Sequence, residues 1–428
     1  MHPLRIAFLI LILAFTAWAQ SSFVSIKDHQ LYLHGKPYTF VGTNYWYGSL
    51  LPLEKDKNRG IDRLRHELDF LKKHGVTNLR LMAGAEGSGP MNGVTRVGPP
   101  LEPEQGKFDE NVLRSLDTLL AEMGKRKMKA VIFLSNNWEW SGGFQQYLIW
   151  NNVIGDDLLT RKPDWDELRD IVAKFYTCEA CVAAYRRQVE YVITHTNGVT
   201  KKRYIDDPTI MAWELANEPR PMRPRANDAY LKWINDSAAY IKSLDHNHLV
   251  TTGSEGWIGT VDKDLFEKSH ASKDIDYITI HIWPKNWGWL VGDKPAFVFE
   301  NAVRKTGEYV YDSVETANSL DKPLVIEEFG APRDNPSIRF ARGESTGFRD
   351  RYYREVLSNL AKRRGGYLVV AGINFWAFGG TARPIPGQPF WKPGDDRMGD
   401  PPMEEQGLNS VFESDTSTWH IIDKYTHR

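Results

Sequence analysis

The sequence contains little cysteine and no excess of charge of either sign. Two of its 428 residues are cysteines, and 54 Lys and Arg residues balance 55 Asp and Glu residues, which leaves a net charge of −1. Proteins that bind nucleic acid have a basic surface. The charge balance therefore argues against nucleic acid as a partner, and because the chain has no polybasic run, a membrane surface is not expected either.

The two cysteines stand close together in the stretch TCEAC, as Cys178 and Cys181. In an oxidising compartment such a pair forms a local disulfide. A redox centre or a metal site is the alternative, but a single C-x-x-C motif lacks the second ligand pair of a zinc site. We therefore interpret the pair as structural or incidental.

Beyond residue 20 the chain also lacks an apolar run of the about 18 residues that a membrane-spanning helix needs. The first residues, MHPLRIAFLILILAFTAWAQ, combine a basic Arg5, an apolar run from Ile6 to Phe15 and the small-x-small pattern Ala17-Trp18-Ala19. This composition is typical of a secretory signal peptide, here residues 1–19, and no cysteine marks a lipid anchor. The protein is expected to be secreted, either to the extracellular medium or to a periplasm, as a soluble chain.

The rest of the chain alternates short apolar segments with longer helical patterns. The apolar segments are Thr39–Asn44, Asn78–Met82, Lys129–Leu134, Ile210–Leu215, Leu249–Gly253, Tyr277–His281, Leu324–Glu328 and Gly372–Trp376. Between them, sets such as Ile61, Leu64, Leu68 and Leu71 recur at helical spacing. Alternating strands and helices imply parallel pairing, and eight repeats predict a closed (β/α)₈ TIM barrel. An open doubly wound sheet is the alternative, but no Gly-rich phosphate loop follows the first strand.

Two further features complete the predicted architecture. The first is an N-terminal β-hairpin, which FVSIKDHQLYLHGKPYTF predicts with a turn at His34-Gly35. The second is a pair of long connections, from Ser135 to about Trp165 after the third strand and from Gly379 to about Gly407 after the eighth. The Pro and Gly content of the latter is typical of a linker, but only about twenty residues follow it. Residues 20–428 are therefore expected to form a single barrel domain.

Polar residues collect at the carboxyl ends of the predicted strands, where a barrel forms its active site. They are Arg80, Asn136-Asn137-Trp138, Asn217-Glu218, His281, Glu328 and Trp376. A buried apolar strand has no structural need to end in such residues, and repetition at six strands is not an ordinary surface transition. The pattern predicts a functional site at this face.

The fourth strand contains two glutamates, in the stretch MAWELANEPRP. Because side chains alternate along a strand, Glu214 and Glu218 share parity and are both expected to point into the barrel. Glu218 lies at the mouth, before Pro219, which cannot continue the ladder, and we interpret it as chemical. Glu214 lies deeper, and because a buried carboxylate is costly unless it is paired, we interpret it as a paired core residue.

At these residues the sequence resembles a known family. WELANEPR and PLVIEEFG resemble the Asn-Glu-Pro and Glu-Phe-Gly motifs of glycoside hydrolase family 5. FVGTNYWY, NNWEWSGGFQQYLIW, YIDDPTIMAWELANEPRP, TTGSEGW and GINFWAFGG are similar to its β-mannanase branch, the endo-1,4-β-mannosidases. The resemblance covers the mature chain nearly end to end. It implies a catalytic barrel that cleaves glycosidic bonds with two carboxyl groups and needs no metal or organic cofactor.

The resemblance also assigns roles by position. Glu218 matches the general acid/base, and Glu328, which precedes Phe329-Gly330, matches the nucleophile. Strand alternation alone does not choose between Glu327 and Glu328; the family motif chooses Glu328. The implied substrate-binding residues are Arg80, Trp138, Asn217, His281, Trp283 and Trp376.

This chemistry needs one protonated and one ionised carboxyl group. We expect Arg80 to lie beside Glu328 and to lower its pKa, and we expect the pKa of Glu218 to be raised. The two carboxyl groups are expected to lie about 5–5.5 Å apart, the spacing that gives retention of anomeric configuration.

Two positions depart from the family pattern. Many members have Tyr two positions after the equivalent of His281, where this chain has Trp283, whose indole N–H can only donate. Many plant and fungal members have Trp shortly after the equivalent of Arg80, where this chain has Met82 in RLMAG. The tryptophans of HIWPKNWGW either compensate by lining the cleft or narrow it.

The expected activity is hydrolysis of β-1,4-mannosidic bonds in mannan, glucomannan or galactomannan, by a monomer. Internal cleavage is favoured over exo action by a β-mannosidase or mannobiohydrolase. A β-1,4-glucanase is the nearest alternative, because mannose differs from glucose only in its axial 2-hydroxyl. A non-catalytic carbohydrate-binding barrel is an alternative of another class, but binding alone has little use for two carboxylates and Arg80.

Overall fold

A computed structural model describes residues 22–290, 295–334, 345–364 and 367–427. The predicted signal peptide, residues 1–19, lies outside the described residues. Within the described part of the chain, no helix is both long and apolar enough to cross a membrane.

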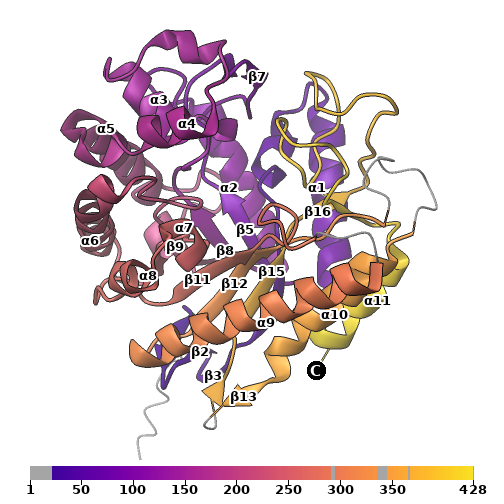
Figure 1. The fold of residues 1–428 in the computed structure, drawn as a ribbon. Helices are drawn as coiled ribbons and strands as arrows, with labels where there is room; N and C mark the ends of the chain where they lie inside the picture. Colours follow the sequence, from indigo (N-terminus) through magenta and orange to yellow (C-terminus); the bar gives the residue numbers. More distant parts are fainter. Residues whose placement is uncertain (1–21, 291–294, 335–344, 365–366, 428) are drawn as a thin grey trace, which may run out of the picture.

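Eight parallel strands form the centre of the molecule, in the order β10-β9-β8-β5-β4-β15-β12-β11 (Figure 1). They are β4 (Phe40–Asn44), β5 (Asn78–Met82), β8 (Lys129–Phe133), β9 (Ile210–Glu214), β10 (Leu249–Thr251), β11 (Ile278–Ile282), β12 (Leu324–Phe329) and β15 (Gly372–Phe375). The ring closes between its end strands, because Asp276 N donates to Val250 O at 2.8 Å and His281 N donates to Glu255 O at 3.0 Å. The predicted barrel is confirmed, and the predicted strand ends differ from the observed ends by at most two residues.

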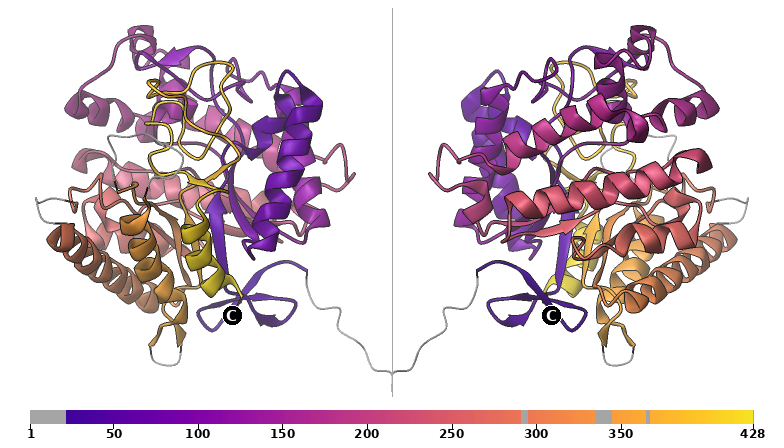
Figure 2. Two further views of the ribbon diagram at one scale, coloured as in Figure 1. Left: turned by 90° about the vertical axis from the view of Figure 1, so that its right-hand side faces the viewer. Right: turned by 90° about the vertical axis from the view of Figure 1, so that its left-hand side faces the viewer.

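Helices surround the strands on the outside (Figures 1 and 2). The longer ones are α1 (Lys57–Lys73), α2 (Glu110–Lys125), α5 (Glu179–Ile193), α6 (Asn227–Leu244), α9 (Pro295–Ser319), α10 (Gly347–Leu357) and α11 (Thr416–Thr426), with the short α7 (Trp257–Thr260) and α8 (Lys263–His270) after β10. Helix α1 illustrates why these segments are helical. The Asp56 carboxylate accepts from the first backbone N–H groups at 3.1 Å, and Leu64, Leu68 and Leu71 are buried on one face.

The N-terminal segment forms the predicted hairpin from β2 (Gln30–Leu33) and β3 (Lys36–Pro37), and β1 (Ser25–Lys27) extends it to a three-stranded antiparallel sheet. The predicted turn is present, with positive φ at His34 and Gly35. Leu31 of this sheet packs against barrel residues such as Phe40 and Tyr277. The sheet lies at the opposite end of the molecule from the long loops, as Figure 2 shows, and therefore away from the expected active site.

Three long connections cover the carboxyl ends of the strands. The connection after β8 contains η2 (Glu139–Ser141), α3 (Gly143–Trp150), η3 (Asp156–Leu159) and α4 (Trp165–Val172). The one after β15 runs between β16 (Phe378–Gly380) and β17 (Val411–Phe412); its residues 381–410, here called the capping loop, contain no helix or strand. The sequence did not predict the third, after β5, which includes the hairpin β6 (Pro90–Met91) and β7 (Val94–Thr95).

The remaining elements are short connections around the barrel: η1 (Gly48–Leu53), η4 (Phe175–Thr177), η5 (Tyr204–Asp206), η6 (Pro224–Ala226), η7 (Ser358–Ala361), β13 (Arg363–Arg364) and β14 (Tyr367–Leu368). One continuous hydrophobic cluster extends through the barrel and its helices, from Val41 to Ile422. The long connections therefore share their core with the barrel.

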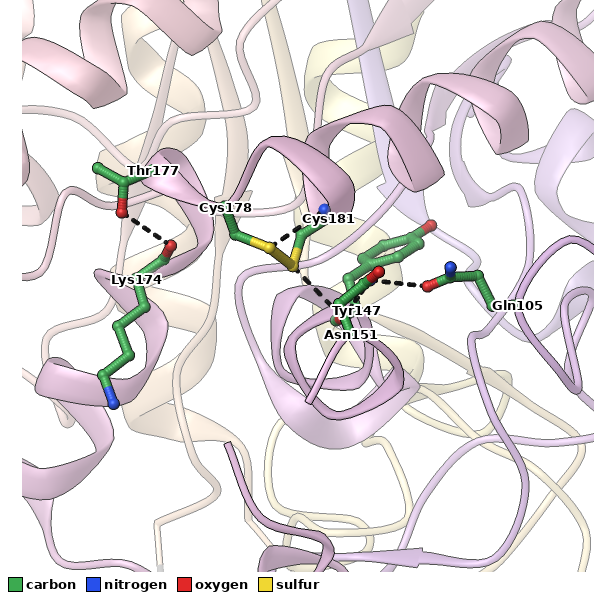
Figure 3. The surroundings of a disulfide bond; sticks show 7 residues. All are labelled: Gln105, Tyr147, Asn151, Lys174, Thr177, Cys178 and Cys181. Carbon is green, nitrogen blue, oxygen red and sulfur yellow. Dashed lines mark hydrogen bonds between the residues drawn. A yellow bond between two sulfur atoms is a disulfide. The ribbon is translucent and has the colours of Figure 1, made fainter. Parts of the chain in front are cut away.

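Cys178 and Cys181 form a disulfide at the start of α5, with an S–S distance of 2.05 Å (Figure 3). The Cys178 sulfur accepts from Cys181 N at 3.2 Å and so caps the helix. Cys181 is buried, 3.4 Å from the carbonyl oxygen of Tyr147 in α3. The pair therefore forms the local disulfide that the sequence allowed, and it closes the first turn of α5.

Candidate active site

A pocket opens at the carboxyl ends of the barrel strands, with a volume of about 630 Å³. All the residues predicted for the site except Arg80 and His281 line this pocket directly, namely Trp138, Asn217, Glu218, Trp283, Glu328 and Trp376. Predominantly apolar walls with a few convergent polar groups are typical of a small-molecule site. The pocket lies at the face where barrel enzymes perform their chemistry.

Two carboxyl groups face each other across the floor of this pocket. Glu328 lies on β12, and Glu218 lies just beyond β9 with a left-handed backbone φ of 49°. Carboxylate oxygens of Glu218 and Glu328 and a ring nitrogen of His281 all lie within 4.8 Å of one another. The two carboxyl groups therefore share one pocket, as expected, with a pair of their oxygens closer together than the about 5–5.5 Å predicted for the carboxyl separation.

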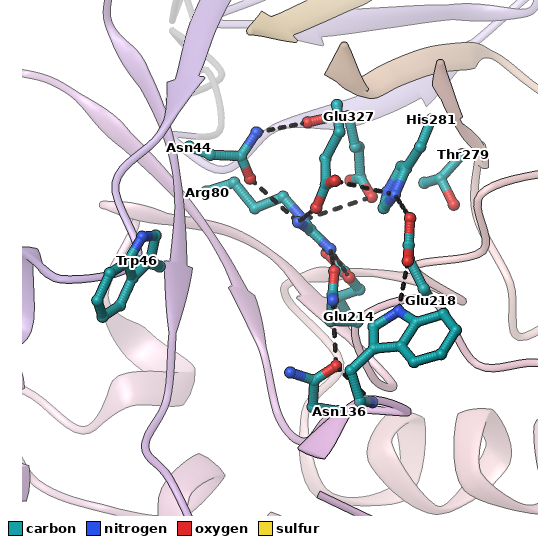
Figure 4. Close-up of polar contacts among 12 residues, drawn as sticks. Asn44, Trp46, Arg80, Asn136, Glu214, Glu218, Thr279, His281 and Glu327 are labelled. Atoms are coloured by element: carbon teal, nitrogen blue, oxygen red, sulfur yellow. Dashed lines mark hydrogen bonds and ion pairs between the residues drawn. The ribbon is translucent and has the colours of Figure 1, made fainter. Parts of the chain in front are cut away.

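Arg80, in the middle of β5, connects the floor of the pocket to the barrel interior (Figure 4). Its Nη1 donates to Glu328 at 2.5 Å, while Nη2 and Nε donate to the two oxygens of Glu214 at 2.5 and 2.8 Å. Asn217 and Asn44 accept further bonds from the same guanidinium at 2.7 and 3.0 Å. Glu214 is thus the paired core carboxylate that its depth in the strand predicted, and Arg80 lies beside Glu328 as expected.

Glu218 is held by two donors from other elements. Trp138 Nε1, in the connection after β8, lies 2.5 Å from Oε2 of Glu218. His281 Nδ1, on β11, lies 2.7 Å from Oε1 of Glu218 and 3.3 Å from Oε2 of Glu328. The resemblance implied His281 as a substrate-binding residue, and the structure places it between the two carboxyl groups.

The electrostatics of this cluster correct one prediction. Burial raises the pKa of Glu218, but the hydrogen bond and charge of His281 outweigh burial, and the pKa is lowered to about 2. For Glu328, burial raises the pKa well above its ordinary value, and the nearby Glu218 adds to the effect of burial against the opposing charge of Arg80. Both pKa directions are opposite to those expected from the sequence, because His281 contacts Glu218 and because burial outweighs the charge of Arg80 at Glu328.

Trp283 compensates for one departure from the family pattern. Its Nε1 donates to Oε2 of Glu328 at 3.1 Å, where many relatives have a tyrosine hydroxyl. The same indole contacts Trp376 edge-on, with ring centroids 5.8 Å apart. Met82, the other departure, is buried in the hydrophobic core and does not line the pocket. Trp283 thus supports the carboxylate and shapes the pocket, while Met82 does neither.

Glu327, the neighbour that the family motif did not choose as the nucleophile, is a buried structural residue. It is fully buried, and Tyr277 Oη donates to it at 3.2 Å. Burial and the charge of Glu214 raise its pKa well above the ordinary value. It does not line the pocket.

The sequence did not predict an ion pair that lies next to Glu218 and Trp138. Arg220 lies over the Trp138 ring, 4.8 Å from its centroid, and forms an ion pair with the buried Glu255 after β10. Burial raises the pKa of Glu255 to about 7, although Arg220 opposes this. Both residues lie in stretches that were quoted as motifs, NEPR and TTGSEGW. Their pairing depends on the spacing of β9 and β10 and was not visible in the chain.

The cluster of Glu218, His281 and Glu328 is also a set of atoms that could hold a metal ion. The predicted chemistry needs both carboxyl groups for itself. A metal bound here would therefore compete with substrate instead of assisting it.

A (β/α)₈ barrel with two facing carboxyl groups, a supporting arginine and tryptophan walls at its mouth defines a glycoside hydrolase. The family described as GH family 5 beta-mannosidase-like matches residues 21–428, and the chain belongs to that family.

Individual relatives agree with this assignment. The chain is 30% identical to mannan endo-1,4-beta-mannosidase 1 of Solanum lycopersicum over 384 residues, 86% of each chain. A glycoside hydrolase family 5 mannosidase from Rhizomucor miehei superposes with a TM-score of 0.82 at 31% identity, covering 95% of this chain and 97% of that one. The endo-beta-1,4-mannanase of Thermotoga petrophila superposes with a TM-score of 0.65 at 25% identity, over 92% of this chain and 77% of that one.

Proposed function

We propose that the protein hydrolyses β-1,4-mannosidic bonds in mannan, glucomannan or galactomannan, with retention of anomeric configuration. The observation on which this depends is the placement of Glu218 and Glu328 oxygens within 4.8 Å of each other, because inverting enzymes keep their carboxyl groups about 6.5–9.5 Å apart to hold a water between them, whereas retaining pairs are closer. The mannan specificity is supported by the names of the tomato and Thermotoga relatives. The Rhizomucor mannosidase has also been solved with mannosyl-fructose.

The reaction proceeds in two displacements. In the first, a Glu328 oxygen bonds to the anomeric carbon while the glycosidic C–O bond breaks, and Glu218 gives its proton to the leaving oxygen. In the second, Glu218 takes a proton from water, the water oxygen bonds to the anomeric carbon, and the ester to Glu328 breaks. Two inversions give net retention.

His281 supplies the route by which the proton reaches Glu218. The pKa directions favour the proton on Glu328, whereas the first displacement needs it on Glu218. The coupled groups titrate together, and His281 Nδ1 lies within 3.3 Å of both carboxyl groups, so the imidazole is placed to pass the proton from Glu328 to Glu218. His281 is therefore a positioning residue for protonation.

Two further residues orient the sugar. Trp376 presents its ring at the floor of the pocket, and stacking that hides on the order of 100 Å² of apolar area contributes roughly 2.5 kcal/mol. Asn217 Nδ2 donates to Asn136 at 3.1 Å and its Oδ1 accepts from Arg80. We propose that this fixed amide binds the 2-hydroxyl of the reacting sugar, which distinguishes mannose from glucose.

We also propose that the protein is exported and acts as a monomer. The N-terminal run of residues 1–19 with its Ala17-Trp18-Ala19 end supports export. The disulfide between Cys178 and Cys181 is consistent with an oxidising compartment. Cleavage of the N-terminus at residue 19 in a secreting host and sedimentation of the purified protein would check both points.

The decisive experiment follows reducing sugar and anomeric configuration, by NMR, during hydrolysis of linear β-1,4-mannan oligosaccharides, glucomannan and cellulose. We expect β-configured first products from the mannans and at most slow cleavage of cellulose. Glu328→Ala should abolish hydrolysis while sugar binding persists. The control Glu104→Ala, which replaces an exposed glutamate that does not line the pocket, should match the wild type. No release of reducing sugar from any β-mannan would overturn the proposal, and faster cleavage of cellulose would favour a β-1,4-glucanase.

A further inference from the structure

The capping loop and the β6–β7 hairpin meet over one side of the pocket. Val94 from the hairpin and Phe390 and Met403 from the capping loop line the active-site pocket on one side. The same three residues line a separate hollow of about 410 Å³ on the other side. They therefore form an apolar ridge between two concave spaces that an open polysaccharide groove would join.

This ridge lies on the side of the pocket that receives the sugar to be transferred. The departing part of a substrate lies toward the acid Glu218, which follows β9. In the ring order, β15 is four places from β9 and so lies opposite it. Trp376 and the capping loop both follow β15. A mannosyl unit stacked on Trp376 therefore has its leaving group toward Glu218 and its 4-hydroxyl toward the ridge.

The loop that forms the ridge is firmly attached to the barrel. Arg397 Nη2 donates to Gly98 O in the connection after β5 at 2.7 Å, and Trp46 Nε1 donates to Gly399 O at 2.8 Å. Arg63, on α1, donates to Arg397 O at 2.7 Å. These bonds join the capping loop to three other elements, so that moving it aside costs several buried hydrogen bonds.

The loop is also braced internally. The buried Asp400 carboxylate accepts from Gly407 N at 2.9 Å, Asn409 N at 3.0 Å and Ser410 Oγ at 2.5 Å. Gln406 Nε2 donates to Asp400 O at 3.0 Å and to Pro401 O at 2.8 Å. Met403 stands inside this braced turn. The ridge is thus a fixed wall of the site.

We infer that the enzyme removes single mannosyl units from the non-reducing end of the chain, because the fixed ridge of Val94, Phe390 and Met403 ends the donor side of the pocket. A chain that continued beyond the sugar on Trp376 would have to pass through the ridge. The side that receives the leaving group is open to solvent instead. It is lined by Trp138, its stacked neighbour Trp165 and Arg220, and Trp165 is 52% exposed. This inference rests on the proposed function and replaces the expectation of internal cleavage.

The test uses β-1,4-mannohexaose labelled at its reducing end, with products followed at early times. We expect unlabelled mannose and the labelled pentamer to exceed all other products by about tenfold, a discrimination that steric exclusion readily supplies. The viscosity of galactomannan should stay nearly constant over the same period. A ladder of labelled lengths from the outset, or mannobiose as the sole small product, would overturn the inference. The absence of any cleavage would instead overturn the proposed function.

Ridge variants make the assignment specific. The double variant Phe390→Ala/Met403→Ala should release longer products and lower galactomannan viscosity, because the donor side then opens into the adjacent hollow. Ile385→Ala is the matched control, since Ile385 is an exposed apolar residue of the same loop, at 46%, that does not line the pocket. An unchanged mannose-only profile in the ridge variant, with the fold intact by circular dichroism, would show that the ridge does not set the mode of cleavage.

Discussion

Trp283 and Arg80 hold the two oxygens of one carboxylate from opposite sides. Trp283 Nε1 lies 3.1 Å from Oε2 of Glu328, and Arg80 Nη1 lies 2.5 Å from Oε1. Both donors are fixed by the barrel, one after β11 and the other on β5. The carboxylate that attacks the sugar is therefore oriented before substrate arrives, which is the condition for efficient nucleophilic catalysis.

Replacing Trp283 should separate its hydrogen bond from its bulk. Trp283→Phe keeps an aromatic ring beside Trp376 but removes the donor, and hydrogen bonds to charged groups are worth about 1.5–3 kcal/mol. We expect kcat/KM on mannooligosaccharides to fall about 10- to 100-fold, mostly in kcat. Trp283→Tyr, whose hydroxyl can donate, should recover part of the loss. Equal losses in both variants would mean that Trp283 acts by packing alone.

Arg80 should matter for folding as well as for catalysis. Arg80→Met leaves Glu214 and Glu328 buried without their cation, and breaking a buried ion pair in this way costs about 3–5 kcal/mol. Urea unfolding should show a drop of this size in the free energy of unfolding. The control is Arg304→Met, which removes the exposed pair with Glu308 and should cost at most about 1 kcal/mol. A small loss for Arg80→Met would mean that the two glutamates take up protons at little cost.

The sequence predicted the barrel and its main catalytic residues because these depend on local patterns. Apolar runs with polar ends locate each strand and its mouth, and the motif around Glu328 chose between neighbouring glutamates that parity could not distinguish. The position of each residue along the strand, deep for Glu214 and at the mouth for Glu218, separated these two glutamates correctly. These predictions need no knowledge of how distant segments meet.

The predictions that were incomplete or wrong all depend on contacts between distant segments. His281 bonds to Glu218 across 63 positions of sequence, and this contact reversed the expected pKa of the acid. Arg220 and Glu255 meet only because β9 and β10 are neighbours. The hairpin that contributes Val94 to the ridge consists of two-residue strands, which are too short to give a period-two pattern.

Acidification should destabilise the protein through His270. This histidine is fully buried between Phe266 O, 2.9 Å from Nδ1, and Thr252 Oγ1, 2.8 Å from Nε2. Burial lowers its pKa to about 4, and the charge of Lys322 acts in the same direction. Below the unfolded-state pKa of about 6.5 the unfolded chain binds a proton that the folded chain refuses, so stability is lost as pH falls from about 6.5 to about 4.

The loss attributable to His270 should reach about 3 kcal/mol at the lower end of that window. Urea unfolding at several pH values would measure it. His270→Gln retains hydrogen-bonding groups but cannot titrate, and its stability should depend less steeply on pH by this amount. If wild type and variant show parallel pH profiles between these limits, another group is responsible for the acid sensitivity.

Reducing the disulfide should affect stability and leave catalysis unchanged. The bond closes a loop of only a few residues, for which the chain-entropy model gives about 2 kcal/mol. Cys178 and Cys181 lie at the start of α5 and do not line the pocket. The Cys178→Ser/Cys181→Ser variant should therefore unfold at lower urea concentration with unchanged kcat/KM, and wild type treated with a reductant should match it. A large loss of activity without unfolding would assign the pair a functional role.

The two carboxyl groups should respond differently to the leaving group of the substrate. An aryl mannoside with a strongly acidic phenol does not need protonation to depart, so Glu218→Ala should form the covalent intermediate at nearly the wild-type rate from it. On mannobiose the same variant should lose the roughly 10²–10⁴-fold that a general acid contributes.

In Glu218→Ala the second displacement lacks a base. Added azide needs no base, so it should restore turnover of the aryl mannoside by this variant and yield the β-mannosyl azide. Glu328→Ala should fail with either substrate and should not give that β product, because no intermediate forms. An α-mannosyl azide from Glu328→Ala would support the same two roles, because azide then replaces the missing nucleophile in a single inversion, whereas failure of azide to rescue Glu218→Ala would contradict the role of Glu218 as the base. A β-mannosyl azide from Glu328→Ala would require the roles of Glu218 and Glu328 to be exchanged. Only a variant that lacks the acid/base and keeps the nucleophile forms the covalent intermediate, and azide attack on that intermediate gives the retained β product.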